Sequence, residues 1–370
     1  MAPRTRFIVK KNRALKRRFL TRSKEHYTLR KIKVIQIGIG HDHATSALNS
    51  LLRQPDIFEV LGFAVPESEE EKYPERIAEY TDGGLLKKYS VDELLALPGV
   101  EAAVIETEEL VLTKYALMAA ERGLHVHMDK PGGADLAEFE RLANTLKERS
   151  LALSLGYMYR FNPKVIEAFK KIGNGDIGEV YCVEAHMDCE HGVGKRQWLS
   201  DFPGGMMFYL GCHLVDLIYR LQGEPDEVIP LSCSTGFDGV TADDYGMVVF
   251  RYPHGISFAK TCDNERGGFI RRQLVICGSK GTIEIKPFEI LTDERDMLYT
   301  VMRETYPGEG WNSFGKETKS ERFNRFDDMM RNFAEVAAGD KVNQYSYDYE
   351  LGLYKLILRA CGKNIDEVLS

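Results

Sequence analysis

Three side chains in this sequence have the chemistry to move a proton at an alcohol: Lys130, Tyr209 and His213. Lys130 follows the strand-like run 125–128, and an ammonium group there could hydrogen-bond a substrate hydroxyl and stabilise a developing alkoxide. The imidazole of His213 has an ordinary pKa near neutrality, so it could remove the hydroxyl proton as a hydride leaves. Together these residue types suit the oxidation of a secondary alcohol.

Each of these residues also has a simpler explanation. The tripeptide Asp129-Lys130-Pro131, taken alone, is more often a solvated turn. Tyr209, His213 and Asp216 are spaced by four and three residues and so share one face of a helix. A histidine there is equally explained as a core residue that Asp216 or the backbone satisfies. Further side chains that could line a substrate pocket, or lie on the surface, are Asp188, His191, Lys195 and Trp198.

A possible anion-binding turn precedes these residues in the run Gly38-Ile39-Gly40-His41-Asp42-His43. Glycines permit close approach of a dinucleotide pyrophosphate, and N–H groups at a helix N-terminus bind the anion. The third glycine position of the motif holds His43, however, and the next strand ends in Val65-Pro66-Glu67 without a terminal acid. An ordinary glycine turn explains the run equally well. If a dinucleotide binds, Glu67 could reach its ribose, and the absence of an arginine directly after that strand favours NAD over NADP.

The elements that must position these groups alternate between strand and helix in the first half. The β-branched run 32–37 stops at Gly38, the segment 44–52 follows as a helix, and 58–65 is a second strand. Such a βαβ unit, continued along the chain, predicts a doubly wound parallel Rossmann sheet. The continuation comprises helices at 91–97 and 112–122, strands at 102–105, 125–128 and 151–155, and a helix that Asp135 and Glu138 begin as a capping box.

From about residue 157 the pattern changes to consecutive strands with few helices between them, which predicts an α/β domain with a large, mostly antiparallel open sheet. The expected strands are 180–186, 245–252, 256–261, 273–277 and 282–285, and the expected helices start at Asn162-Pro163 and span 207–221 and 349–361. We therefore expect four parts: a basic, disordered extension (1–30), an NAD(P)-binding Rossmann domain (31–156), a substrate-binding and oligomerisation domain (157–345), and a terminal helix that packs back on the body (346–370).

Composition narrows the class of protein. The 370 residues exceed what a single core usually holds, and with 44% hydrophobic and 28% charged residues the chain lacks a long apolar run that could span a membrane. The net charge is −7, but residues 1–30 contain 11 Lys/Arg and a single acid, Glu25, so the rest is strongly acidic. An acidic body argues against a nucleic-acid enzyme. Residues 1–30 lack the apolar stretch of a secretory signal, and we interpret them as a disordered extension or a mis-assigned start rather than a transit peptide or nucleic-acid-binding arm.

The seven cysteines are an odd number and form no C-x-x-C pair. Reduced thiols in a cytoplasmic protein fit this usage best. We expect no metal site.

Taken together and in this order, the motifs resemble those of the Gfo/Idh/MocA oxidoreductases, a family that includes glucose-fructose oxidoreductase and inositol dehydrogenase. The resemblance covers about residues 31–365. Asp129-Lys130-Pro131 is similar to the family's E-K-P motif, and Tyr159-Arg160-Phe161-Asn162-Pro163 to its Y-R-F-x-P run. The segment from Trp198 through Gly204-Gly205 to Asp216 is similar to its W…G-G-G…D-x-G-x-H-x-x-D pattern.

The resemblance implies an NAD(P) held between two domains, reversible oxidation of a sugar or cyclitol hydroxyl, and an open sheet used for oligomer contacts. It assigns Lys130 and His213 as catalytic residues and places Arg160 beside cofactor and substrate. We thus predict a cytoplasmic, homo-oligomeric (dimeric or tetrameric) dehydrogenase that favours NAD. The predicted cofactor-binding residues are Gly38, Ile39, Gly40, His41, Asp42, His43, Glu67, Thr107, Asp129, Lys130 and Arg160; the predicted substrate-binding residues are Tyr159, Asp188, Trp198, Tyr209 and His213, of which Tyr209 joins Lys130 and His213 in catalysis.

Three departures from the family pattern leave other functions open. Tyr209 replaces the usual aspartate, Pro203-Gly204-Gly205 replaces G-G-G, and the segment 107–112 lacks the proline and histidine of a T-P-x-x-x-H stretch. A phenol, with a reference pKa near 10, is a poorer base than a carboxylate at neutral pH. One alternative is a redox-neutral, NAD-assisted elimination or epimerisation of a sugar. Another is a non-catalytic sensor or regulatory subunit that binds a dinucleotide.

Overall fold

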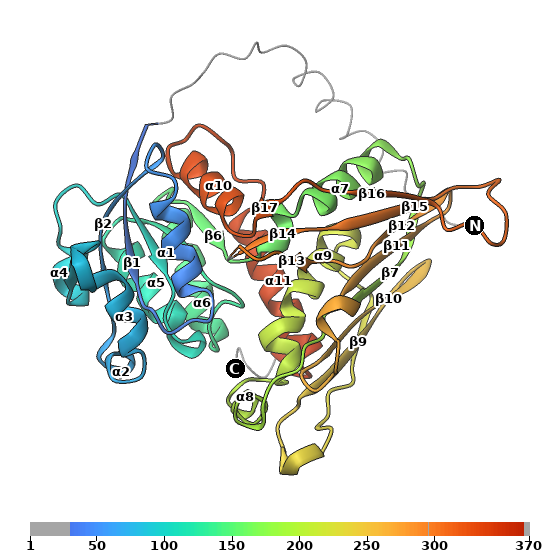
Figure 1. Ribbon diagram of the computed structural model, residues 1–370, viewed down its shortest axis with the longest axis horizontal. Coiled ribbons are helices and arrows are strands. Elements are labelled where there is room, and N and C mark those ends of the chain that lie inside the picture. Colours follow the sequence, from blue (N-terminus) through green and yellow to red (C-terminus); the bar gives the residue numbers. More distant parts are fainter. Residues whose placement is uncertain (1–29, 295, 366–370) are drawn as a thin grey trace, which may run out of the picture.

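The computed structural model describes residues 30–294 and 296–365, which form two sheet-based halves (Figure 1). The basic extension predicted for residues 1–30 lies, apart from Arg30, outside the described residues.

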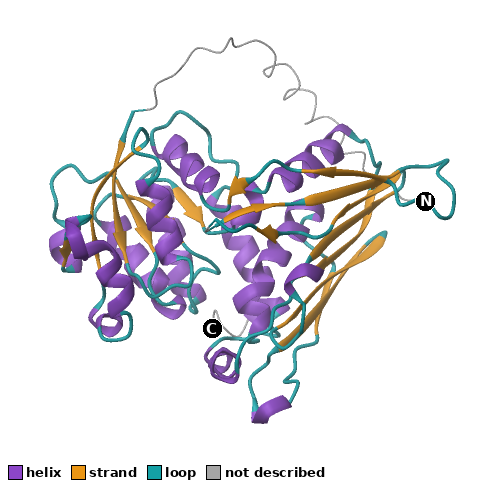
Figure 2. Ribbon diagram, viewed as in Figure 1, coloured by secondary structure: helices purple, strands orange, loops and turns teal. Residues whose placement is uncertain are grey.

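Six parallel strands form the sheet of the N-terminal half, in the order β3-β2-β1-β4-β5-β6. The central strands are apolar and buried, as expected for parallel strands covered on both faces, and Figure 2 shows helices on both sides. This order is that of a doubly wound dinucleotide-binding sheet, so the predicted Rossmann architecture is confirmed. The strands are β1 (Ile32–Ile37), β2 (Phe58–Ala64), β3 (Lys88–Tyr89), β4 (Ala102–Ile105), β5 (His125–Met128) and β6 (Leu153–Leu155).

The helices of this half follow the predicted alternation, with two additions. In α6 (Leu136–Glu148) the Asp135 carboxylate accepts a hydrogen bond from the Glu138 N–H at 2.9 Å, which starts the helix. The other predicted helices are α1 (Ala44–Leu52), α4 (Val91–Leu95) and α5 (Leu112–Glu121). The additions, α2 (Glu67–Glu70) and α3 (Pro74–Thr81), come directly after β2. α2 has an acidic, mostly exposed first turn and no apolar face, and in the short α3 only Tyr80 is fully buried, with Ile77 packed beside the core.

Eight strands form the sheet of the second half, in the order β16-β15-β12-β11-β7-β10-β9-β8. All its described strand pairs are antiparallel except β7 with β10, so the predicted mostly antiparallel sheet is confirmed. Its strands are β7 (Val180–His186), β8 (Glu227–Pro230), β9 (Tyr245–Tyr252), β10 (Gly255–Cys262), β11 (Gln273–Gly278), β12 (Gly281–Ile285), β15 (Val301–Thr305) and β16 (Lys316–Lys319). A small sheet of β13 (Ile290–Leu291), β14 (Met297–Tyr299) and β17 (Phe323–Asn324) adjoins it.

Helices cover one face of the large sheet, between it and the Rossmann half (Figure 1). On that face alternate residues such as Val183, Ala185 and Phe250 are fully buried, whereas Cys182 on the other face is half-buried. The sheet is therefore open on one side, and its predicted use in oligomer contacts stays a prediction. The helices of this half are α7 (Pro163–Asn174), α8 (Val193–Trp198), α9 (Cys212–Gln222), α10 (Asp327–Ala337) and α11 (Tyr347–Ala360).

The predicted helix 207–221 differs from expectation at its start. Residues Met207–Gly211 form a π-helical turn, and the α-helix begins only at Cys212. Tyr209 thus lies in the π-helical turn and His213 in the α-helix, so the regular α-helical spacing assumed from the sequence does not apply between them. Such turns are frequent at functional sites.

The terminal helix α11 packs back on the N-terminal half. The Tyr354 ring lies 4.8 Å from the Phe139 ring of α6, and Lys355 pairs with Glu140. On another side, the carboxylate of Asp327 accepts a hydrogen bond from Ser50 of α1 at 2.7 Å. Both connections join the two sheets into one body. Of the helices that the structure describes, none is long and apolar enough to cross a membrane.

Candidate active site

The turn after β1 brings two backbone N–H groups onto one carboxylate. Gly38 has a φ of +97°, and a Cβ there would lie 2.3 Å from the Thr107 nitrogen, so only glycine allows this turn to approach the end of β4. The N–H groups of Ile39 and Gly40 then donate to Oε2 of Glu69 at 3.0 and 2.9 Å. The turn thus binds an anionic oxygen, and that oxygen belongs to the chain itself.

Glu69 comes from α2 and is completely buried. Its Oε1 accepts a third hydrogen bond, from the Glu108 N–H at 2.7 Å. Burial raises the pKa of Glu69, although the three backbone N–H groups oppose the shift. Glu67, which we predicted to reach a ribose, is exposed at the start of α2. The acid that contacts the glycine turn is therefore two residues further on.

Behind the turn, imidazole and carboxyl side chains gather at the carboxyl ends of β1, β4 and β5. His41 Nδ1 lies 3.2 Å from Oδ2 of Asp129 and 3.8 Å from Oε2 of Glu106. His43 Nδ1 lies 2.9 Å from the same Asp129 oxygen. Burial lowers the pKa of His41 to about 3, so its ring is neutral. Burial, together with the nearby Asp129 carboxylate, raises the pKa of Glu106.

Lys130 and His213 lie beside this cluster. The Lys130 ammonium is 2% exposed and donates to the Tyr209 carbonyl oxygen at 3.2 Å. His213 is 1% exposed, and within the described part of the chain neither of its ring nitrogens has a hydrogen-bond partner. Burial, and then the charge of Lys130, lower the pKa of His213. Its imidazole is therefore neutral and unpartnered, and the same shift makes it a weaker base than an exposed histidine.

Tyr209 forms a contact between the two halves of the molecule. Its hydroxyl donates to the carboxylate of Asp42, in the turn after β1, and Lys195 Nζ lies 2.8 Å from the same carboxylate. The Lys195 ammonium also lies 3.6 Å from the centre of the Trp198 ring. Burial, with the Asp42 charge, raises the pKa of Tyr209. Burial alone would raise the pKa of Asp42, but Lys195 and Tyr209 outweigh it and lower that pKa. The phenol is thus a fixed proton donor.

Other predicted site residues lie in buried ion networks. Arg160 pairs with Asp216 at 2.7 Å and with Glu350 at 2.6 Å, and all three are buried. The Tyr159 hydroxyl donates to Glu289 at 2.8 Å. Asp188 pairs with Lys260 Nζ at 3.0 Å. Asp216 is therefore engaged with Arg160 and does not satisfy His213, as the alternative explanation of that histidine required.

The structure thus brings together five predicted residues near the carboxyl ends of β1, β4 and β5: His41, His43, Asp129, Lys130 and His213. Sequence reasoning missed three buried acids around them, which are Glu69, Glu106 and Glu109. The departure of segment 107–112 from the family pattern drew attention to this region but did not indicate its charge. Thr107 is buried against Gly38.

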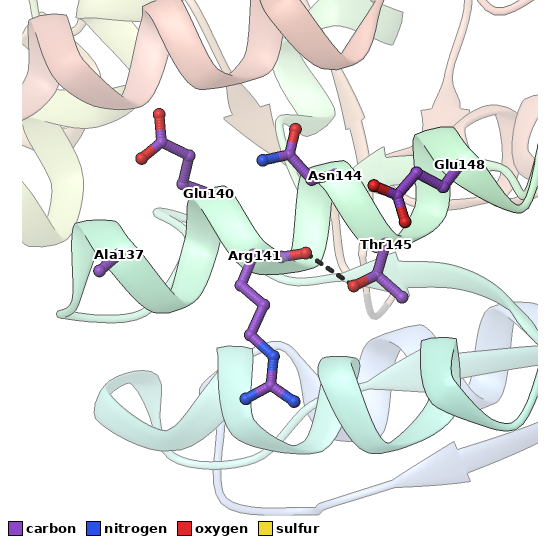
Figure 3. Close-up of a pocket in the computed structure, with 6 residues that line it drawn as sticks. All are labelled: Ala137, Glu140, Arg141, Asn144, Thr145 and Glu148. Carbon is purple, nitrogen blue, oxygen red and sulfur yellow. Dashed lines mark hydrogen bonds between the residues drawn. The ribbon is translucent and has the colours of Figure 1, made fainter.

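A surface depression on α6, of about 470 Å³, does not form a second site (Figure 3). Its side chains belong to one exposed helix face and do not converge on a common point. They are Ala137, Glu140, Arg141, Asn144, Thr145 and Glu148.

Two family models match the chain. One, described as the oxidoreductase family with an NAD-binding Rossmann fold, covers residues 32–157, and the other, the GFO/IDH/MocA C-terminal domain, covers residues 165–284. This chain belongs to the Gfo/Idh/MocA family. The resemblance predicted from its motifs is confirmed, and with it the NAD(P)-binding class of its Rossmann half.

Curated relatives of this Gfo/Idh/MocA protein include dehydrogenases and a hydratase. The scyllo-inositol 2-dehydrogenase (NAD(+)) of Bacillus subtilis is 31% identical over 140 residues, which cover 37% of this chain and 40% of that protein. The D-xylose 1-dehydrogenase (NADP(+)) 2 of Haloferax volcanii is 26% identical over 163 residues, covering 44% and 50%. The 2,7-anhydro-N-acetylneuraminate hydratase of Mediterraneibacter gnavus is 23% identical over 216 residues, covering 57% and 56%. For the first four curated relatives, the match spans 38% to 63% of their length.

Solved structures of the same fold cover nearly the whole chain. The aldose-aldose oxidoreductase from Caulobacter crescentus, complexed with glycerol, has a TM-score of 0.71 at 20% identity and covers 90% of this chain and 98% of that one. A 3-ketoreductase from Actinomadura kijaniata, in complex with NADP and TDP-benzene, has a TM-score of 0.73 at 18% identity, covering 89% and 96%. These likenesses show the fold.

Proposed function

We propose that this protein is an NAD(P)-dependent oxidoreductase that transfers a hydride between a secondary hydroxyl of a sugar, cyclitol or glycoside and nicotinamide. The observation that carries the proposal is the pair Lys130 and His213. Both side chains are buried near each other, and among the described residues neither imidazole nitrogen of His213 has a hydrogen-bond partner. Leaving a buried polar group without a partner costs about 1–3 kcal/mol. An imidazole kept in that state beside an ammonium suits a site that is completed by a ligand.

The roles of the side chains follow from their charge states. The Lys130 ammonium orients the substrate hydroxyl and stabilises the developing alkoxide, and the neutral His213 accepts the hydroxyl proton. A bound nicotinamide supplies the hydride acceptor. The Tyr209 hydroxyl already donates its proton to a hydrogen bond with Asp42. Tyr209 therefore joins the two halves of the molecule and does not act as the base.

The glycine turn has a donor set that fits a pyrophosphate, since the N–H groups of Ile39 and Gly40 already converge on an anionic oxygen. In this structure Glu69 takes that place, so a dinucleotide must displace its carboxylate. The desolvation of Glu69 opposes its charged form and makes the displacement easier. The acidic first turn of α2, which contains Glu67, Glu69 and Glu70, disfavours the 2′-phosphate of NADP and supports NAD.

A second candidate reaction is a redox-neutral elimination or epimerisation on a sugar. It is supported by the relative named as a hydratase and by the protonated Tyr209 in place of the family's aspartate. In such a reaction, transient oxidation acidifies a neighbouring C–H, and His213 removes that proton. Steady product formation without accumulation of NADH distinguishes this reaction from a net oxidation.

The test is a screen of the purified full chain with NAD or NADP against polyols, aldoses and glycosides, following NADH absorbance and product together. We expect Lys130→Met to lower kcat by about 10²–10⁴ with little change in NAD affinity. The exposed Lys114, changed to Met, is the matched control and should leave kcat unchanged. An unchanged kcat in Lys130→Met would contradict the assignment. Binding of NAD without turnover across the panel would favour the non-catalytic alternative.

A further inference from the structure

Three potential ligand residues lie close together near the carboxyl ends of β1 and β5. They are His41, His43 and Asp129, whose ligand atoms all lie within 4.8 Å of one another. Asp129 Oδ2 lies 2.9 Å from His43 Nδ1 and 3.2 Å from His41 Nδ1. Glu106 Oε2, just after β4, lies 3.8 Å from His41 Nδ1 and so adjoins this group.

These separations match the size of a metal site. Bonds of about 2.0–2.1 Å to nitrogen and oxygen, arranged tetrahedrally, place neighbouring ligand atoms about 3.3–3.4 Å apart. The two separations from Asp129 Oδ2, 2.9 and 3.2 Å, lie just below that value. Shifts of a few tenths of an ångström would bring these pairs of atoms to the separation that one ion requires.

The electrostatics of the cluster also call for a cation. Glu106 is fully buried, and among the described residues neither of its oxygens has a hydrogen-bond partner. Asp129 lies beside it and is 1% exposed, so two carboxyl groups share a closed pocket. Buried charge is costly unless it is paired or coordinates a metal. The neighbouring Lys130 supplies a single positive charge, and its ammonium donates to the Tyr209 carbonyl.

We propose that His41, His43 and Asp129, with Glu106 beside them, bind a divalent first-row transition metal ion. Two imidazole nitrogens with a carboxylate oxygen suit Zn²⁺, Fe²⁺ or Mn²⁺ better than Mg²⁺ or Ca²⁺, which prefer oxygen ligands alone. The site does not rest on the proposed hydride transfer, and it departs from the expectation, drawn from the sequence, that no metal site is present.

The surroundings of His41 fit this role. Its Nε2 points to Oε1 of Glu109 at 3.7 Å, and a carboxylate beyond a ligating histidine is the common way to fix the ring's tautomer. The lone pair of His41 Nδ1 accepts the His43 N–H at 3.1 Å in this structure. A bound ion would replace that hydrogen bond. At 3.7 Å His41 Nε2 and Glu109 Oε1 are not hydrogen-bonded, so Glu109 would act as an outer-shell acceptor only if it moved closer to His41.

The chain offers an internal control. A separate cluster of Cys189, His191 and Asp263 in the second half also has ligand-type atoms close together. It contains a sulfur, whereas the proposed site has only nitrogen and oxygen ligands. A third cluster, Cys182, Glu184 and Cys277, also contains sulfur. The elements bound to the ion therefore distinguish the proposed site from both cysteine-containing clusters.

The experiment uses the full chain, stripped of metal with a chelator and titrated with Zn²⁺, with Mg²⁺ as a hard-cation control. We expect one Zn²⁺ per chain and an X-ray absorption spectrum with nitrogen and oxygen neighbours only. His43→Ala and Asp129→Asn should each weaken Zn²⁺ binding by more than the roughly 10- to 100-fold loss typical of an outer-shell change, and the control His191→Ala should leave it unchanged.

Three results would overturn the proposal. Sulfur in the coordination shell would assign the ion to a cysteine-containing cluster, and loss of Zn²⁺ binding only in His191→Ala would assign it to Cys189, His191 and Asp263. Absence of Zn²⁺ binding by the unmodified chain would mean that Glu106 and Asp129 share a proton instead. The absorption spectrum needs no variant, so it decides even if a substituted chain fails to fold. Failure of metal binding leaves the hydride-transfer proposal intact, because that proposal is tested by kcat in Lys130→Met.

Discussion

Two parts of the candidate active site in this Gfo/Idh/MocA protein differ in how their polar groups are satisfied. At the glycine turn, the N–H groups of Ile39 and Gly40 donate to Glu69. His213 is equally buried, but its ring nitrogens have no partner among the described residues. The first part is therefore occupied by a side chain of the protein itself, whereas the second has hydrogen-bonding groups left for a ligand. The difference predicts that a dinucleotide, bound as proposed, competes with Glu69 at the turn.

The largest expected effect is the loss of kcat when His213 is changed. We expect His213→Asn to lower kcat by about 10²–10⁴, because the proton acceptor is lost, with NAD affinity changed less than about threefold. The half-buried His186, on the open face of the large sheet, is the control, and His186→Asn should keep full kcat. Steady-state kinetics and NAD titration of both variants measure the changes in kcat and in NAD affinity separately. A drop in NAD affinity with normal kcat would place His213 in cofactor binding alone.

The buried network around Arg160 provides a contrast, since its charges are satisfied within the protein. Removing the guanidinium in Arg160→Met leaves Asp216 and Glu350 buried without their cation, and we expect a loss of about 3–5 kcal/mol in the free energy of unfolding in urea. Arg53→Met, which breaks the partly exposed pair with Asp327, should cost at most about 1 kcal/mol. Lost NAD affinity without lost stability would show instead that Arg160 serves the cofactor site.

A smaller effect is expected at the contact between the two halves. Tyr209→Phe removes one hydrogen bond to the ionised Asp42, worth about 1.5 kcal/mol. If turnover needs the two halves to be held together at this contact, kcat/KM should fall about tenfold. The pH profile of kcat should keep its shape, because Tyr209 is not the base. Loss of one limb of that profile would instead make Tyr209 the group that titrates.

Local patterns in the sequence predicted the helices and strands, but they did not predict which buried polar side chains contact one another. The β-branched run of β1, the capped helix α6 and the alternating strands of the large sheet carry their own signals, and all formed as predicted. The acidic helix α2 has the composition of a solvated surface, so nothing local indicated that Glu69 turns inward. Its burial depends on the fold bringing β2 beside the turn after β1.

The same reason explains which site contacts were missed. Lys130 and His213 could be named from their motifs, but Arg160 meets Asp216 and Glu350 across 56 and 190 residues of sequence. His43 meets Asp129 across 86 residues. Pairings at such separations follow from strand order and helix packing, which single-chain periodicity does not specify.

The competition at the glycine turn is tested most directly by titrating NAD into the unmodified chain and into Glu69→Ala. Removing the carboxylate raises the fraction of molecules whose turn is free, so the variant should bind NAD at least about fivefold more tightly. Glu67→Ala, at the exposed neighbouring acid, should leave the affinity unchanged. Equal or weaker binding by Glu69→Ala, or absence of NAD binding in both chains, would contradict a turn that holds either Glu69 or a pyrophosphate.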